Sequence, residues 1–178
     1  MIIAIIVFIL LYLLISAGIY LAMDYLYMDE TNVLRVPKHG WVFYLLQLTW
    51  GLPINIVGGI VALICLCRGI KPKKYGWNYW LECPVNFGLN LGIFFIAPKN
   101  ASKHVKNHEC GHSIQNIYFG PFHFIVVCLP SALRFWARTY WTRRGCRLEK
   151  DYDSIWFEWQ ATQLGNKLEE WHKRNGED

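Results

Sequence analysis

The chain has 178 residues, of which 54% are hydrophobic and 17% charged. Soluble domains of this size seldom have such a composition, so it favours a membrane protein. The net charge of +5 fits basic residues beside an anionic lipid surface, so we expect the bilayer as a partner and no nucleic acid. The six cysteines include no C-x-x-C pair, which excludes zinc-knuckle and thioredoxin-like motifs and fits reduced thiols facing the cytosol.

Two apolar runs at the N-terminal end predict transmembrane helices. The first, about residues 2–23, has no charged residue and is long enough to cross the hydrocarbon layer. No basic segment precedes it and it is long for a signal peptide, so we interpret it as a retained anchor. The second run, about residues 41–67, contains Pro53, where we expect a kink or an irregular turn. Residues 1–74 are therefore predicted to form a membrane anchor.

The distribution of charge predicts the orientation of this anchor. Four basic residues follow the second run, namely Arg68, Lys71, Lys73 and Lys74, whereas the connection between the two runs is more acidic. Basic residues mark the cytoplasmic side of membrane spans. We therefore expect an integral protein of the cell membrane with both termini and the following domain in the cytoplasm.

Residues 75–178 are predicted to form one compact unit that carries the chemistry. Aromatic and branched residues from 77 to 97, interrupted by glycine and proline, predict two strands or a hairpin. Ser102 is the expected N-cap of a helix that continues through Phe119, because Gly120 and Pro121 are typical just beyond a helix end. The fold class is therefore mainly α with a small β element.

Two more segments follow this helix. Residues 122–136 are apolar but short for a span, and a crossing would place Arg138 and later arginines on the wrong side of the membrane. We therefore expect this segment to be re-entrant or membrane-associated. A last helix is expected to begin at an N-cap, Asp153 or Ser154, and to continue to about Arg174.

The segment HECGH, residues 108–112, predicts a metal site within the helix after Ser102. Residues four apart lie on one helix face, so His108 and His112 can direct their imidazoles at a single ion. Glu109 is one step around the helix, where its carboxylate can accept a proton from a water held by the metal and return it to a leaving amine. Imidazole ligands suit zinc, so the predicted cofactor is Zn²⁺.

A catalytic zinc ion usually has three protein ligands and one open position. The candidates for the third ligand are Glu158, Asp151, Asp153, His123, Glu149 and Cys128. We favour Glu158 because it lies in an apolar setting, where an unpaired carboxylate is costly. Gly111, Ala161 and Gly165 would let the two helices approach closely enough to share an ion. The alternative is that Glu158 pairs with an arginine at the level of the lipid headgroups.

These residues resemble the zincin metallopeptidases, in the gluzincin-like branch that joins H-E-x-x-H to a downstream glutamate in an E-x-x-A setting. The matching positions are His108, Glu109, His112, Glu158 and Ala161. The chain is also similar to small bacterial membrane proteins with H-E-x-G-H-x-x-Q followed by Gly-Pro and Pro-Ser. The resemblance covers about residues 89–165. It implies a zincin-like helical unit with Glu109 as catalytic base, and an edge strand near residues 91–96 that pairs with an extended peptide substrate.

Other zinc peptidase patterns fit less well. The metzincin form is excluded because Gln115 and Tyr118 stand where that motif has glycine and histidine. A site-2-type protease takes an aspartate in an apolar helix as its third ligand, whereas Asp151 and Asp153 lie in a charged turn. Tyr118 and Tyr152 are both candidates to donate a hydrogen bond to an oxyanion.

The leading hypothesis is a membrane-bound zinc peptidase that acts on peptide or membrane-protein substrates. One alternative is a non-catalytic membrane interaction protein that keeps the metal as a structural clamp. Another is a metal-dependent hydrolase of a non-peptide substrate. Glu109 distinguishes the first two, because a structural site needs the ligands but has no use for that carboxylate. His104 and His123 are expected to be ordinary surface or core histidines.

Overall fold

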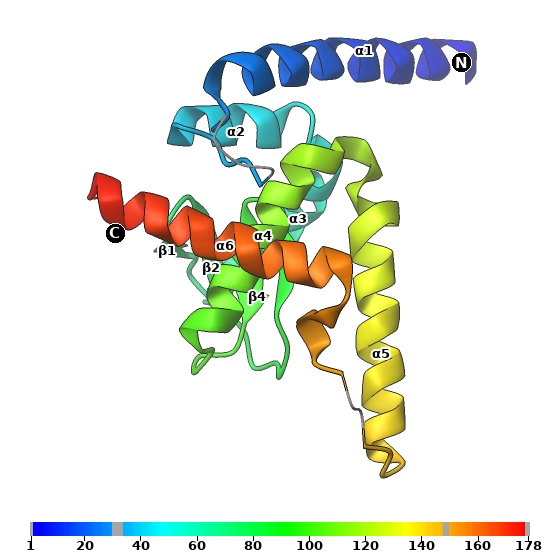
Figure 1. The fold of residues 1–178 in the computed structure, drawn as a ribbon. Coiled ribbons are helices and arrows are strands. Elements are labelled where there is room, and N and C mark those ends of the chain that lie inside the picture. The colour runs from blue at the N-terminus through cyan, green and yellow to red at the C-terminus, as the bar shows by residue number, and fades with distance from the viewer. Residues whose placement is uncertain (1, 30–33, 148–149, 177–178) are drawn as a thin grey trace.

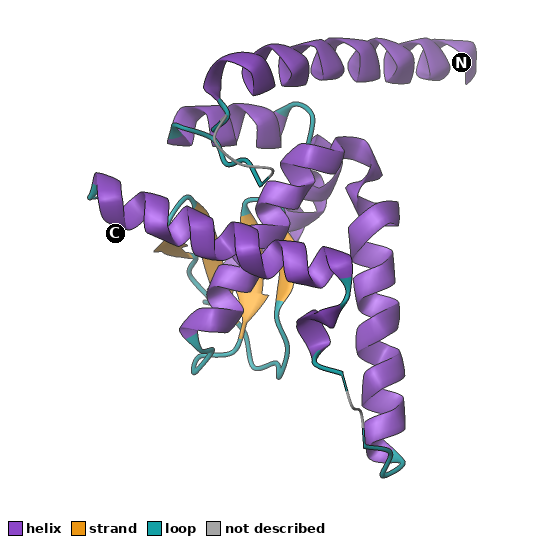
Figure 2. Ribbon diagram, viewed as in Figure 1, coloured by secondary structure: helices purple, strands orange, loops and turns teal. Residues whose placement is uncertain are grey.

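The computed structural model describes residues 2–29, 34–147 and 150–176, and it confirms a mainly helical chain with one small sheet (Figure 2). Helix α1 (Ile2–Tyr27) lies along the top of the molecule in Figure 1, above α2. The Tyr12 hydroxyl donates to the Thr49 carbonyl at 2.8 Å, and Tyr20 stacks on Trp50. Most other side chains of α1 are apolar and exposed, so this helix is long and apolar enough to cross a membrane.

The second predicted span is broken into two helices, α2 (Gly40–Leu48) and α3 (Leu52–Cys67), which meet at 95°. Pro53 occupies the first turn of α3, where its missing N–H costs nothing. The Asn116 amide donates to the Gly51 carbonyl at 3.0 Å and holds the break. The expected kink is present, but the structure shows one clear spanning helix rather than two.

The small β element is larger than expected. It has four strands, β1 (Lys73–Tyr75), β2 (Asn78–Glu82), β3 (Leu89–Leu91) and β4 (Phe94–Ala97), in the order β1-β2-β4-β3. Strands β2 and β4 are parallel, and the other two pairs are antiparallel.

The expectation of one edge strand near residues 91–96 is wrong. Gly92 adopts φ 79°, and the chain reverses there between β3 and β4. Because β4 lies between β2 and β3, its backbone groups are already paired within the sheet. The edge of the sheet on this side is β3.

Helices α4 (Lys103–Phe119) and α6 (Trp156–Asn175) cross each other beside the sheet (Figure 1). The Ser102 side chain accepts a hydrogen bond from the Val105 N–H at 3.3 Å, and Gly120 ends the helix at φ 51°. The predicted bounds of α4 are therefore confirmed. The core around it contains fully buried apolar side chains from the sheet, α2, α4 and α6, among them Phe95, Ile114, Ile117, Leu46 and Leu164.

The segment after α4 leaves the core. A short 3₁₀ turn, η1 (Gly120–Phe122), is followed by a π-helical turn, η2 (Phe124–Cys128), and by α5 (Leu129–Arg143). The chain bends by 119° between α4 with η1 and the helix that starts at Phe124. In Figure 1, α5 runs down one side of the molecule. No residue of α5 is buried.

The predicted N-cap of the last helix is wrong. Asp153 and Ser154 belong to a 3₁₀ turn, η3 (Tyr152–Ser154), and α6 begins two residues later at Trp156. The Asp153 carboxylate accepts a hydrogen bond from the Thr162 hydroxyl at 2.8 Å instead of capping the backbone. Ser154 donates to the Asp151 carbonyl at 2.8 Å.

Candidate metal centre

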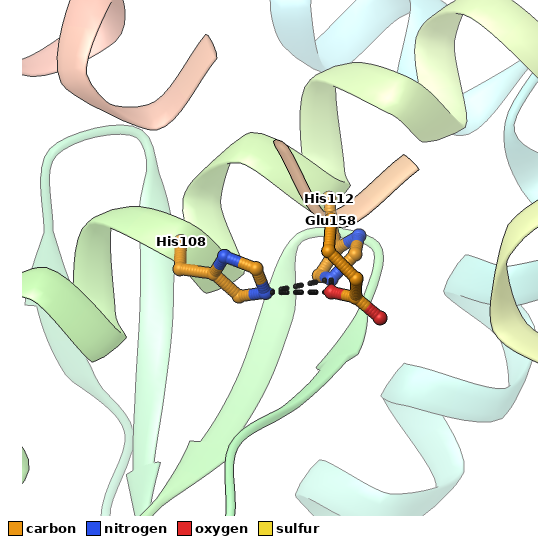
Figure 3. Close-up of side chains that lie close together, drawn as sticks. All are labelled: His108, His112 and Glu158. Atoms are coloured by element: carbon orange, nitrogen blue, oxygen red, sulfur yellow. Dashed lines mark hydrogen bonds and ion pairs between the residues drawn. The ribbon is translucent and has the colours of Figure 1, made fainter. Parts of the chain in front are cut away.

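The structure brings the three predicted ligands together at the crossing of α4 and α6 (Figure 3). His108 Nε2 lies 3.1 Å from His112 Nε2 and 3.0 Å from Glu158 Oε2. His112 Nε2 lies 3.3 Å from the same carboxylate oxygen. All three side chains are buried. The group therefore consists of two imidazole nitrogens from α4 and one carboxylate oxygen from α6.

Small residues at the helix crossing make this convergence possible. A Cβ atom on Gly111 would lie 1.7 Å from the Ala161 carbonyl oxygen. A Cβ atom on Gly165 would lie 1.9 Å from the Asn107 carbonyl oxygen. The two helices thus touch backbone to backbone, as the glycines in the sequence suggested. A larger side chain at either glycine would move Glu158 away from the two histidines.

The tautomer of His108 follows from its partner on α6. Thr162 donates its one hydroxyl hydrogen to the Asp153 carboxylate. The Thr162 oxygen, 2.9 Å from His108 Nδ1, therefore accepts a hydrogen bond from that nitrogen. With the hydrogen on Nδ1, the neutral imidazole presents a lone pair at Nε2.

His112 is oriented in the same way by Gln115. The Gln115 amide donates to the Phe157 carbonyl at 2.7 Å and to Gln160 Oε1 at 2.9 Å. Its oxygen therefore faces His112 Nδ1, from which it accepts a hydrogen bond at 2.7 Å. His112 Nε2 then also presents a lone pair toward the centre of the group.

The arrangement fits a metal ion. When both imidazoles are neutral, this tautomer leaves three acceptor atoms facing one another at 3.0–3.3 Å, an arrangement that needs a cation between them. Although burial acts in the opposite direction, the contact with Glu158 raises the pKa of His112, so the carboxylate favours positive charge at this point. Ligand atoms about 2.0–2.2 Å from a tetrahedral zinc ion are separated by roughly 3.3–3.6 Å, so a small outward movement of the three side chains would admit the ion. The second oxygen of Glu158 is buried with no hydrogen-bond partner among the described residues. This donor set suits a divalent transition metal.

The other candidates for the third ligand lie elsewhere. Asp153 accepts from Thr162 and lies 3.2 Å from His104, and Asp151 is exposed. His123 and Cys128 line the neighbouring cavity but are outside the cluster of converging atoms. Glu149 lies outside the described residues.

Glu158 does not make the alternative ion pair with an arginine in the described part of the chain. Its ion pairs are with His108 and His112. Burial alone would raise the pKa of Glu158, but contact with the His108 and His112 nitrogens holds that pKa well below its ordinary value. The carboxylate is therefore ionised and able to act as a ligand.

Glu109 lies next to the cluster and is 5% exposed. Its Oε2 atom has no hydrogen-bond partner in the described structure. Gly88 packs directly against the carboxylate, because a Cβ atom there would lie 2.0 Å from Glu109 Oε1. Burial raises the pKa of Glu109, whereas the neighbouring His112 and His108 act in the opposite direction.

A cavity of about 530 Å³ opens beside Glu109 and the two histidines. Its walls come from the loop before β3, β3 itself, α4, η2, α5 and η3. Most of the lining side chains are apolar, including Phe87, Leu89, Val105, Val127 and Phe135. The cavity therefore offers an apolar pocket with a few polar groups at one end, as is usual for sites that bind small molecules or peptides.

The two tyrosines considered from the sequence have different places. Tyr152 lines the cavity, and its hydroxyl lies 3.2 Å from the Ser131 hydroxyl. Burial and the charge of Glu158 raise the pKa of Tyr152, so it remains a neutral phenol. Tyr118 donates to the carbonyl of Arg35, a residue that is far from the ligands in the sequence. Tyr118 does not line the cavity.

Three features of the site were not predicted from the sequence. Thr162 orients His108, and Gln115 orients His112. The spacing could have indicated both roles, because Thr162 lies one turn after Glu158 and Gln115 lies one turn after His112. His123 is 1% exposed, and neither of its ring nitrogens has a hydrogen-bond partner among the described residues. Burial lowers the pKa of His123 to about 3, so this imidazole is neutral.

Comparison with protein-family models, with curated proteins and with solved structures finds no significant match to this chain. The resemblance to zincins therefore rests on the motif residues. The function is therefore inferred from the geometry of the cluster and of the cavity next to it.

Proposed function

We propose that this protein is a membrane-bound zinc peptidase, in which His108, His112 and Glu158 hold the ion and Glu109 is the general base. The observation that carries the proposal is the convergence of three acceptor atoms at 3.0–3.3 Å, with both imidazoles oriented by partners on their far sides. When bound, zinc lowers the pKa of a water ligand toward about 7 and polarises a carbonyl group.

Glu109 supports a catalytic site over a purely structural one. Its carboxylate lines the cavity and keeps one oxygen without a partner in the described structure. A buried unpaired carboxylate is costly, and a structural site would gain nothing from it. In the proposed reaction, Glu109 accepts a proton from the attacking water and returns it to the leaving amine. Tyr152 donates a hydrogen bond to the developing oxyanion.

The edge strand supports a peptide as the substrate. Leu89 and Asn90 of β3 line the cavity, and β3 is an edge of the sheet. An extended peptide can add to such an edge through main-chain hydrogen bonds. The apolar walls would then receive a substrate side chain. The same walls favour a second candidate, a hydrolase of a lipid-like amide or ester.

The location in the cell also belongs to this proposal. Helix α1 would anchor the protein in the cell membrane, and the basic residues after α3 would keep the catalytic unit on the cytoplasmic side. The bent pair of α2 and α3 would serve as a second membrane-associated element.

The test of the metal centre is elemental analysis of detergent-purified protein. We expect about one zinc ion per chain in the wild type and in Glu109→Gln, and a loss of zinc in His112→Ala and Glu158→Ala. Thermal melting would establish that all four proteins are folded. A folded wild type without bound metal after zinc reconstitution would overturn the proposal, and zinc retained by Glu158→Ala would exclude Glu158 as a ligand.

The test of catalysis is cleavage of a peptide library by the zinc-loaded protein. General acid–base catalysis contributes about 10²–10⁴-fold to a rate, so Glu109→Gln should lose at least that factor while it keeps its zinc. Equal cleavage by the wild type and by Glu109→Gln would contradict the role of Glu109. Cleavage of lipid amides or esters instead of peptides would favour the second candidate.

A further inference from the structure

We propose that the segment from Phe124 to Arg143, here called the arm, lies on the surface of an anionic lipid bilayer with its apolar face among the headgroups. The arm consists of η2 and α5. This inference is independent of the proposed peptidase activity, because it concerns the outer face of the arm and not the metal ligands.

The outer face of the arm is a largely exposed apolar stripe, in which Tyr140 packs against its chain neighbours Trp141 and Arg144. Large apolar side chains recur every three or four residues along it and are 41–66% exposed: Ile125, Leu129, Leu133, Trp136 and Tyr140. This spacing places them on one side of the helix. No residue of α5 is buried, so α5 depends on something outside the described fold to cover this side.

Aromatic and basic residues indicate lipid as that cover. Trp136, Tyr140 and Trp141 are about half exposed or more, and such rings favour the boundary between headgroups and hydrocarbon. The C-terminal end of the arm and the turn after it carry exposed positive charges, namely Arg143, Arg144, Arg147 and Lys150. An amphipathic helix with this pattern binds anionic membranes. The bilayer is already adjacent to the protein, because α1 is able to span it.

The opposite face of the arm shows that it lies along the membrane and does not cross it. Arg134 donates to the carbonyls of Asp151 and Tyr152 at 2.9–3.1 Å, and Arg138 donates to the Lys150 carbonyl at 2.8 Å. A crossing helix would carry both guanidinium groups and these partners into hydrocarbon. The 119° bend also separates the arm from α4, whose middle residues are buried in the protein.

The arm is at the same time a wall of the metal cavity. Ser131, Ala132, Phe135 and Trp136 of α5 line the cavity, and Trp136 lies where the apolar stripe borders it. Through Arg134 the arm also holds the backbone of Tyr152, whose ring lines the cavity. The cavity therefore lies next to the lipid surface, and contact with lipid would fix the position of one of its walls.

The experiment is photo-crosslinking of the full chain in nanodiscs made of phosphatidylcholine, with or without phosphatidylglycerol. Benzoylphenylalanine would replace Leu133 or Trp136, and in a control it would replace Asn166, an exposed residue of α6. We expect lipid adducts by mass spectrometry from positions 133 and 136, several-fold more with phosphatidylglycerol, and few from position 166. Protein–protein crosslinks in place of lipid adducts, or equal adducts from all three positions, would overturn the proposal.

A charge variant tests the preference for anionic lipid separately. The triple substitution Arg143→Gln, Arg144→Gln, Arg147→Gln should remove most of the effect of phosphatidylglycerol on crosslinking from position 136. Its zinc content should equal that of the wild type, so a failure of the lipid proposal is distinguishable from a failure of the metal centre. An unchanged effect of phosphatidylglycerol in a folded variant would contradict the role of these charges.

Discussion

Thr162 shows how one side chain outside the proposed ligand set can orient a proposed metal ligand. Its hydroxyl connects the Asp153 carboxylate to His108 Nδ1 and so fixes both the ring orientation and the tautomer. Partners of this kind typically contribute 10–100-fold to metal affinity. Gln115 has the corresponding role for His112.

The first prediction concerns Thr162→Val, which keeps the shape of the side chain but removes both hydrogen bonds. We expect zinc affinity to fall by about 10–100-fold, as measured by competition with a chelator, because His108 loses its fixed orientation. Thr142→Val, an exposed position on α5, is the matched control and should leave the affinity unchanged. Unaltered affinity in Thr162→Val would show that the hydrogen bond does not orient the ligand.

The second prediction concerns Gly88→Ala. The new methyl group would lie 2.0 Å from Glu109 Oε1, so the carboxylate must move from its place beside the ligands. We expect a loss of hydrolytic rate approaching that of Glu109→Gln, with a full complement of zinc. A variant that cleaves normally would mean that the position of Glu109 tolerates this displacement.

At the scale of elements, the crossing of α4 and α6 determines whether the site forms. The third prediction is that Gly111→Ala separates the helices, because its methyl group would meet the Ala161 backbone at 1.7 Å. Overpacking of this kind costs about 1–3 kcal/mol or more, so the melting temperature and the zinc content should both fall. The control is Gly59→Ala, in α3, where no atom lies within 4 Å and the change should stabilise the helix by about 0.5–1 kcal/mol.

Ion pairs between side chains also join the same two helices near their ends. Glu169 of α6 lies 2.6 Å from Lys103 at the start of α4 and 2.5 Å from Lys173. Hydrogen bonds from Lys103 and Lys173 lower the pKa of Glu169 to about 2. Burial acts in the opposite direction, and a hydrogen bond donated by the Asn107 amide lowers the pKa further. A carboxylate with a lowered pKa stabilises the fold above its ordinary pKa, and this stabilisation is lost as the pH falls.

The fourth prediction follows from this loss of stabilisation at low pH. Between about pH 4.5 and pH 2, the wild type should lose stability as Glu169 becomes protonated, and Glu169→Gln should lose less over the same range. Chemical unfolding of both proteins at a series of pH values measures the difference. Parallel curves for the two proteins would show that this ion cluster does not stabilise the crossing.

At the scale of the molecule, the features predicted from the sequence are those with local causes. Ser102 and Gly120 determine the two ends of α4 through a cap and a left-handed turn, so both ends were predicted. The order of the strands and the angle between α2 and α3 depend on contacts between distant residues, such as Asn116 with Gly51. Single-sequence patterns contain no direct record of such contacts.

The predicted ligands show the same difference between features with local causes and features that depend on contacts between distant residues. His108 and His112 follow from helical spacing alone. Glu158 was predicted because a buried, unpaired carboxylate is costly, and the structure does bring Glu158 to the histidines. The orienting role of Thr162 and the lack of a hydrogen-bond partner for His123 among the described residues depend on three-dimensional packing, which the sequence does not record.

The separation of the ligands along the chain has a consequence for assembly. Two ligands precede the arm and one follows it, yet α4 and α6 are in direct backbone contact. The helix contact therefore holds the site together, and the covalent connection through the turn after α5 is not required for this. A protein cleaved between α5 and α6 should keep its two pieces associated, and two separately produced fragments divided at this turn should recombine into a zinc-binding complex.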